Sequence, residues 1–128
     1  MVQNTDPVFG LTPVIGQASI ATANTNRDGT GTIGTLLTGS ANGTRVDFCV
    51  IKSIVTTTAG MIRFYIDDGA GNIYLWDELV VTAITASGTV AAFRGVIQLG
   101  FQLPSGYILK ASTQNAETFR CFVHGANL

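Results

Sequence analysis

Apolar and polar residues alternate along much of this sequence, and this period of two is the feature that most constrains its fold. Residues 61–67 place Ile62, Phe64 and Ile66 on one face of a strand and the intervening residues on the other. Thr, Gly, Val and Ile are abundant, whereas the three- or four-residue spacing of an amphipathic helix is almost absent. The pattern therefore predicts β-strands that pack one face on a core.

Turn-forming residues divide the sequence into eight strand-like runs. The Asn-Gly pair at 42–43 and the Asp-Gly pair at 68–69 tolerate the positive φ of tight hairpins, and stretches rich in Gly, Ser and Pro separate the other runs. Eight short strands without intervening helices predict an all-β, two-sheet antiparallel sandwich that is jelly-roll-like. An immunoglobulin-like sandwich is the nearest alternative, but Trp76 lies too far from Cys49 to occupy the next strand. The predicted strands span about 17–23, 32–38, 44–56, 60–67, 72–85, 90–99, 106–112 and 117–124.

The alternation also predicts which side chains form the core. A change of phase after Lys52 predicts a β-bulge or a bend near residues 51–53. Cys49 and Cys121 lie in strand-like runs and are interpreted as small buried residues with free thiols rather than as a disulfide. The side chains expected in the core are Val46, Phe48, Val50, Ile62, Phe64, Ile66, Phe119 and Cys121.

The first 16 residues follow a different pattern from the rest. Pro7, Pro13 and two glycines interrupt any regular element, yet the segment is also rich in apolar residues. We expect an extended N-terminal arm at 1–16, followed by a β-sandwich domain at 17–128. The apolar side chains of the arm are expected to bind the neighbouring subunit, with the arm's own domain as the alternative. The residues expected in this contact are Val8, Phe9, Leu11, Val14 and Ile15.

Length, charge and hydropathy exclude several classes of protein. A chain of 128 residues suits one domain. A net charge of −1, with seven Lys and Arg spread evenly, gives no electrostatic attraction to nucleic acid or to an anionic membrane. No apolar run approaches the roughly 18 residues of a transmembrane helix. Charged residues form only 12% of the chain, about half the usual share, which favours burial of surface by self-association.

Three motifs resemble chemical sites, and each has a simpler interpretation. Residues 29–34 match the dinucleotide motif G-x-G-x-x-G, but no helix start follows them. Residues 67–78 begin with Asp and end with Glu like a calcium loop, but glycines at two ligand positions favour a hairpin loop, with weak calcium binding as the alternative. His124 lacks nearby catalytic or zinc-ligating partners in the sequence and is interpreted as a surface or subunit-contact residue. We therefore expect no enzyme activity and no catalytic, cofactor-binding or metal-binding residues.

Three aromatic residues fall within one predicted hairpin. Tyr65 lies on the wetter face of its strand, and Tyr74 and Trp76 alternate along the next. Such a set can form a surface site that binds a sugar or a protein partner, or it can form the second half of a core.

Residues 50–69, 73–81 and 103–119 resemble small β-sandwich (jelly-roll) structural and decoration proteins of tailed bacteriophages. The resemblance extends over about residues 45–125, and its motifs are structural and carry no catalytic residue. It implies a virion protein, and in first place a capsid decoration (cement) protein on the capsid surface that forms a homotrimer and binds the phage major capsid protein. The alternative is a tail, baseplate or fibre module that binds carbohydrate through the three aromatic residues.

The expected place of synthesis follows from the start of the chain. The N-terminal sequence lacks the basic start and apolar core of a secretory signal, so we expect synthesis in the host cytoplasm. Besides itself and the capsid, we expect no cofactor, nucleic acid or membrane as a partner.

Overall fold

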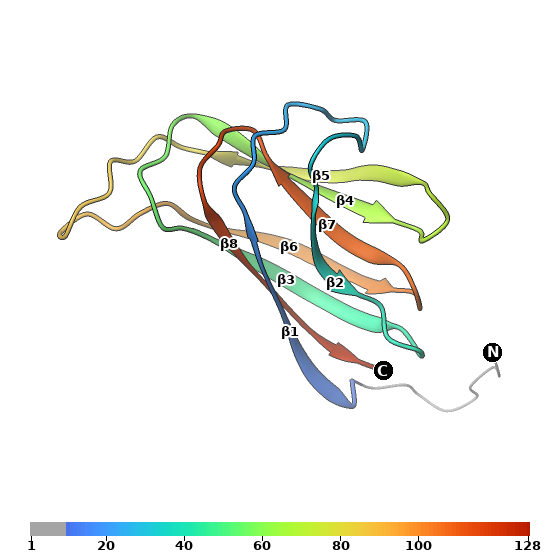
Figure 1. Ribbon diagram of the computed structural model, residues 1–128. Coiled ribbons are helices and arrows are strands. Elements are labelled where there is room, and N and C mark those ends of the chain that lie inside the picture. Colours follow the sequence, from blue (N-terminus) through green and yellow to red (C-terminus); the bar gives the residue numbers. More distant parts are fainter. Residues whose placement is uncertain (1–9) are drawn as a thin grey trace.

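The computed structural model describes residues 10–128, which form eight strands in two antiparallel sheets packed face to face (Figure 1). One sheet has the order β1-β8-β3-β6 and the other β2-β7-β4-β5, and the described residues contain no helix. The strands are β1 (Thr12–Ile20), β2 (Gly34–Thr38), β3 (Thr44–Ser53), β4 (Gly60–Asp67), β5 (Ile73–Val81), β6 (Arg94–Leu103), β7 (Ile108–Thr113) and β8 (Phe119–Asn127). The predicted all-β two-sheet sandwich is confirmed.

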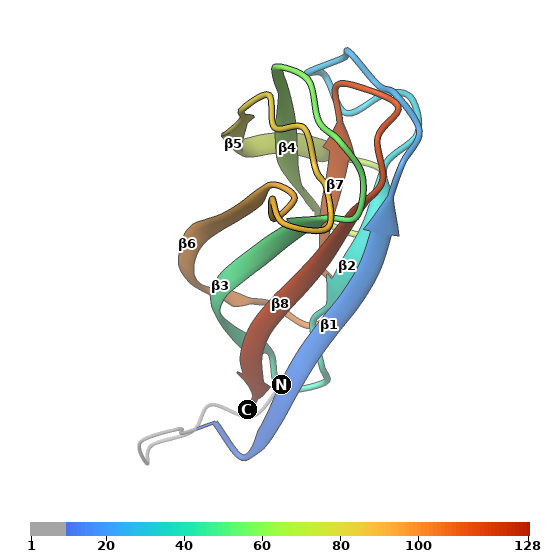
Figure 2. The same ribbon diagram turned by 90° about the vertical axis from the view of Figure 1, so that its left-hand side faces the viewer.

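The strands pair in the order of a jelly roll. β1 pairs with β8, β2 with β7, β3 with β6 and β4 with β5, each antiparallel. The chain is thus arranged as one long hairpin, bent between β4 and β5, that is wound around a core. Figure 2 shows the resulting layers from the side, with the start of β1 and the C-terminus at the same end. This strand order differs from that of the immunoglobulin-like alternative.

The sandwich begins earlier in the sequence than expected. Strand β1 starts at Thr12, and the N–H of Leu11 already donates to the carbonyl of Asn127 at 2.8 Å. Pro13 is tolerated because β1 is the outermost strand of its sheet, where a missing N–H need not break a ladder. The predicted boundary at residues 16 and 17 is therefore wrong, since residues 12–16 belong to the sandwich. Residues 1–9, including Val8 and Phe9, lie outside the described residues.

The core contains most of the predicted side chains, but the phase of β3 differs from the prediction. Near residues 51–53 the pairing is regular, and the chain bends only after the strand, at residues 54–55. The bulge lies instead between Val46 and Phe48, where β3 has one residue more than β8, and β6 in turn has one residue more than β3. It turns Phe48 and Val50 to the outer face, where they are half-buried, and so corrects their assignment to the core. The side chains confirmed as buried are Val46, Ile62, Phe64, Phe119 and Cys121, and Ile66 packs against them partly buried.

Both cysteines face this core. Cys49 and Cys121 are fully buried and free, as the sequence predicted. A hydrogen bond with Cys49, together with burial, raises the pKa of the Cys121 thiol, so this thiol remains protonated.

The connection between β1 and β2, residues 21–33, covers the outer face of the β2-β7-β4-β5 sheet. The N–H of Asn24 donates to a β7 carbonyl at 2.8 Å, and the Asn24 carbonyl accepts from Nη1 of Arg63 at 3.1 Å. The hydroxyl of Tyr65 donates to the carbonyl of Asn26 at 2.8 Å. Gly29 has a φ of 86° and lies so close to β5 that a Cβ would fall 2.5 Å from a backbone oxygen. Gly29 therefore allows this close packing.

Candidate interaction surface

The outer face of the β1-β8-β3-β6 sheet, here called the outer sheet face, carries apolar side chains in rows across the strands. The phase set by the β3 bulge places these side chains outward, while the alternate residues fill the core. Ile15 and Val96 are 53% and 39% exposed, and the ring of Phe48 stacks on His124 at 4.4 Å. One row consists of Ile15, His124, Phe48 and Gln98, and the next of Gln17, Phe122, Val50 and Val96. An apolar area of this kind is typical of an interface.

A third row on the same face places three cations side by side. Lys52 pairs with Arg94 on β6 and with Arg120 on β8. Like charges on adjacent strands are destabilising in the isolated sheet. Among residues 10–128, these three cations have no carboxylate partner, and only Lys52 has a recorded acceptor, the carbonyl of Ala92 at 2.7 Å. The cations that do form ion pairs in the described chain are Arg27, Arg45, Arg63 and Lys110.

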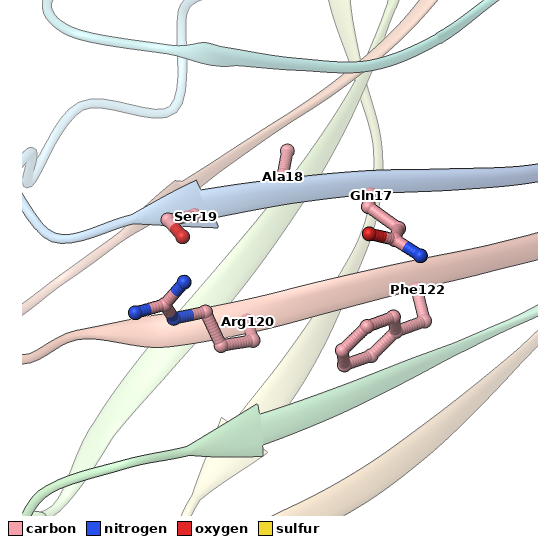
Figure 3. Close-up of a pocket in the computed structure, with 5 residues that line it drawn as sticks. All are labelled: Gln17, Ala18, Ser19, Arg120 and Phe122. Carbon is pink, nitrogen blue, oxygen red and sulfur yellow. The ribbon is translucent and has the colours of Figure 1, made fainter.

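A shallow recess of about 400 Å³ lies where the apolar and cationic rows meet β1. Figure 3 shows Gln17, Ser19, Arg120 and Phe122 beside it, whereas Ala18 points away from them. Ala18 packs against the core, in agreement with the alternation along β1. The recess thus combines an aromatic ring, a guanidinium group and short polar side chains on the outer sheet face.

The structure separates the residues that the sequence assigned to the arm. Leu11 is 77% exposed just before β1, and Ile15 lies on the outer sheet face. Val14 is partly buried and packs against the core of its own subunit.

The three aromatic residues of the predicted surface site do not form one site. Tyr65 is fully buried beneath residues 21–33, whereas Tyr74 and Trp76 are 70% and 39% exposed on β5. Trp76 is the extra residue of a bulge in β5, and its ring meets Phe101 of β6 edge to face at 5.1 Å. The expected shared surface is therefore corrected, because the connection between β1 and β2 covers Tyr65.

The hairpin loop that resembled a calcium site forms its own contacts. Asp67 forms an ion pair with Lys110 at 3.0 Å. The pKa of the Asp67 carboxyl is lowered mainly by the hydrogen bond from the N–H of Gly69 and further by the hydrogen bond from Lys110. Within residues 10–128, no cluster of three or more His, Cys, Asp or Glu side chains is arranged to hold a metal ion. The same residues include no helix long and apolar enough to cross a membrane.

Comparison with known proteins gives distant structural similarities only. No protein-family model matches the sequence, and no curated protein matches it. Two structures of a pentameric capsid protein isolated from metagenomic phage sequences resemble this chain with 15% and 16% identity, both with a TM-score of 0.45. The alignments cover 94% and 98% of this chain and 65% and 69% of those chains, so this chain is shorter than either. A structure of the T13 IBDV viral particle shares 10% identity with a TM-score of 0.44, over 99% of this chain and 35% of that one. Similarity at this level carries no inference about the function of this chain.

Proposed function

We propose that the chain is a structural protein of a bacteriophage virion, and specifically a capsid decoration protein. It forms a homotrimer on the capsid surface and stabilises the head by binding major capsid subunits. The outer sheet face carries this proposal, because apolar rows beside unpartnered cations form a binding surface that a free monomer does not need. The jelly-roll topology is an architecture of capsid domains, and the sequence resemblance over about residues 45–125 supports a virion protein.

The copy number of the chain in purified virions tests this proposal. A decoration protein occurs in a fixed ratio to the major capsid protein, because it occupies repeated positions of the lattice. We therefore expect quantitative mass spectrometry of purified heads to find the chain in such a ratio. A chain found only in tail fractions, or absent from particles, would overturn the assignment.

We propose further that the segment before β1 attaches the subunit to the capsid. Val8 and Phe9 contribute on the order of 1.5–3 kcal/mol each when buried, which ordering of the backbone at about 1–2 kcal/mol per residue opposes. Deletion of residues 2–9 is expected to weaken binding to undecorated capsids by more than about tenfold. The melting temperature should change little, since the bond from Leu11 to Asn127 and the whole of β1 remain. Co-sedimentation with capsids and thermal unfolding measure the two effects.

A deletion of residues 2–5 is the matched control, because it shortens the segment and keeps Val8 and Phe9. This control should bind capsids as the full chain does. Unaltered affinity after deletion of residues 2–9 would show that the segment has no role in attachment. A deletion that extends to residue 15 is not suitable, because it removes residues 12–15 of β1.

A further inference from the structure

A second surface of the chain joins exposed aromatic side chains to an unpartnered carboxylate. β5 is the outermost strand of its sheet, and Tyr74 and Trp76 are exposed along it. The neighbouring Asp77 is also exposed, and its carboxylate accepts the N–H of Glu78 at 2.8 Å. Within residues 10–128, Asp77 forms no ion pair with Lys or Arg. These three residues, Tyr74, Trp76 and Asp77, are here called the β5 edge patch.

The outer sheet face and the β5 edge patch are complementary in charge and similar in apolar character. The outer sheet face presents Lys52, Arg94 and Arg120, and these cations have no carboxylate partner in the described chain. They lie beside the apolar side chains of Val96 and Phe122. The β5 edge patch presents a carboxylate beside two exposed aromatic rings. An interface that buries charged groups must also pair them, because a charge buried without a partner is strongly unfavourable.

We propose that copies of this chain associate by docking the β5 edge patch of one subunit on the outer sheet face of the next. Asp77 then lies opposite the cation row, in which Lys52 is flanked by Arg94 and Arg120, and Tyr74 and Trp76 pack on the apolar rows beside it. This inference deepens the proposed function, since it names the surfaces that form the homotrimer.

The use of two different patches determines the kind of assembly. Contacts between unlike surfaces are heterologous, and they form a ring when the rotation between subunits closes; a cyclic trimer requires a contact of this kind. Pairing of two outer sheet faces would instead leave the cations of both copies without carboxylates. Asp47, the carboxylate nearest to this face along β3, is already bound by Arg45 at 3.1 Å.

Charge reversal in the full chain tests the interface by sedimentation equilibrium. The wild-type chain is expected to form a ring, which the proposed function makes a trimer. Asp77→Arg should raise the dissociation constant of the ring by more than about tenfold, because it places like charges in contact. The triple variant Asp77→Arg, Arg94→Glu and Arg120→Glu should recover the ring, because both signs are exchanged. High salt should weaken the wild-type ring.

Two controls separate the contact from general effects of charge or folding. Thr89→Arg adds a charge at an exposed position between β5 and β6 and should leave the ring unchanged. Thermal unfolding should show that every variant is folded, because Asp77, Arg94 and Arg120 are all exposed. A folded triple variant that dissociates like Asp77→Arg would overturn the proposal, as would a ring that Asp77→Arg leaves intact.

A monomeric wild-type chain would also overturn the interface. If such a monomer bound a single-stranded 20-nucleotide DNA, and Arg94→Glu with Arg120→Glu abolished that binding, the cation row would belong to a nucleic-acid site instead. The interface and the proposed function fail separately. Rings that are absent from virions overturn the decoration role and leave the interface standing, whereas monomers that bind capsids overturn this interface and the free trimer and leave the capsid-binding role standing.

Discussion

Replacement of Phe64 by alanine is expected to lower the free energy of unfolding by about 3–5 kcal/mol. Phe64 is fully buried on β4, a central strand, and faces the core between the two sheets. The loss of the ring leaves a cavity that close-packed neighbours fill only in part, so the cost exceeds that of lost apolar burial alone. Urea unfolding at one fixed protein concentration measures the change, with the midpoint lowered and the slope retained.

Phe48→Ala is the matched control for this prediction. The sequence pattern placed Phe48 in the core, but the structure places it half-buried on the outer sheet face, stacked on His124. Its truncation should cost about 1–2 kcal/mol, because it removes a stacking contact without opening a cavity in the core. A cost equal to that of Phe64→Ala would contradict the observed phase of β3.

The sequence predicted the eight strands because period-two alternation and turn residues are local signals. It did not locate the bulge in β3, because this strand carries apolar residues on both faces. Phe48 and Val50 face outward, whereas Cys49 and Ile51 face inward, so alternation alone is satisfied by either phase. Pairing with both β6 and β8 decides between the two phases, and that pairing is not local.

The candidate interface was less accessible to prediction than the fold. Lys52, Arg94 and Arg120 are far apart in the sequence and were interpreted as evenly spread charges. Strand register alone brings them into one row. The sequence placed Tyr65 on the wetter face of its strand and left open whether it forms a surface site or part of a core; polar contacts and a close backbone approach dock residues 21–33 over it. Hydrophobic patterning contains no information about a covering connection of this kind.

Replacement of Arg63 by alanine is expected to destabilise the fold by about 3–5 kcal/mol and to release residues 21–33 from the sheet. Arg63 is 3% exposed and donates to Glu78 at 3.2 Å, to the Asn24 carbonyl at 3.1 Å and to Gln114 at 2.7 Å. Its removal leaves the buried Asn24 carbonyl and the part-buried side-chain oxygen of Gln114 without this donor, each at a cost of about 1–3 kcal/mol, while Glu78 keeps its bond from Arg27. Urea unfolding measures the loss, and faster hydrogen exchange at the amide of Asn24 reports the released connection.

Arg27→Ala separates the buried network from its exposed part. Arg27 binds the same Glu78 oxygen at 2.8 Å but is 58% exposed, so its removal should cost less than about 1 kcal/mol. The hydrogen bond that Arg27 donates is the main cause that lowers the pKa of Glu78 from its ordinary 4.5. The positive charges of Arg27 and Arg63 lower this pKa further. A carboxyl group with a lowered pKa stabilises the fold above its unfolded pKa and loses this effect as the pH falls through the folded pKa.

The difference in stability between the wild-type chain and Arg27→Ala should therefore be present at neutral pH. It should disappear as acidification below about pH 4.5 protonates Glu78. Urea unfolding of both proteins across this pH range measures that difference. An Arg27→Ala variant as unstable as Arg63→Ala at neutral pH would show instead that the exposed ion pair, and not the buried guanidinium, holds residues 21–33 on the sheet.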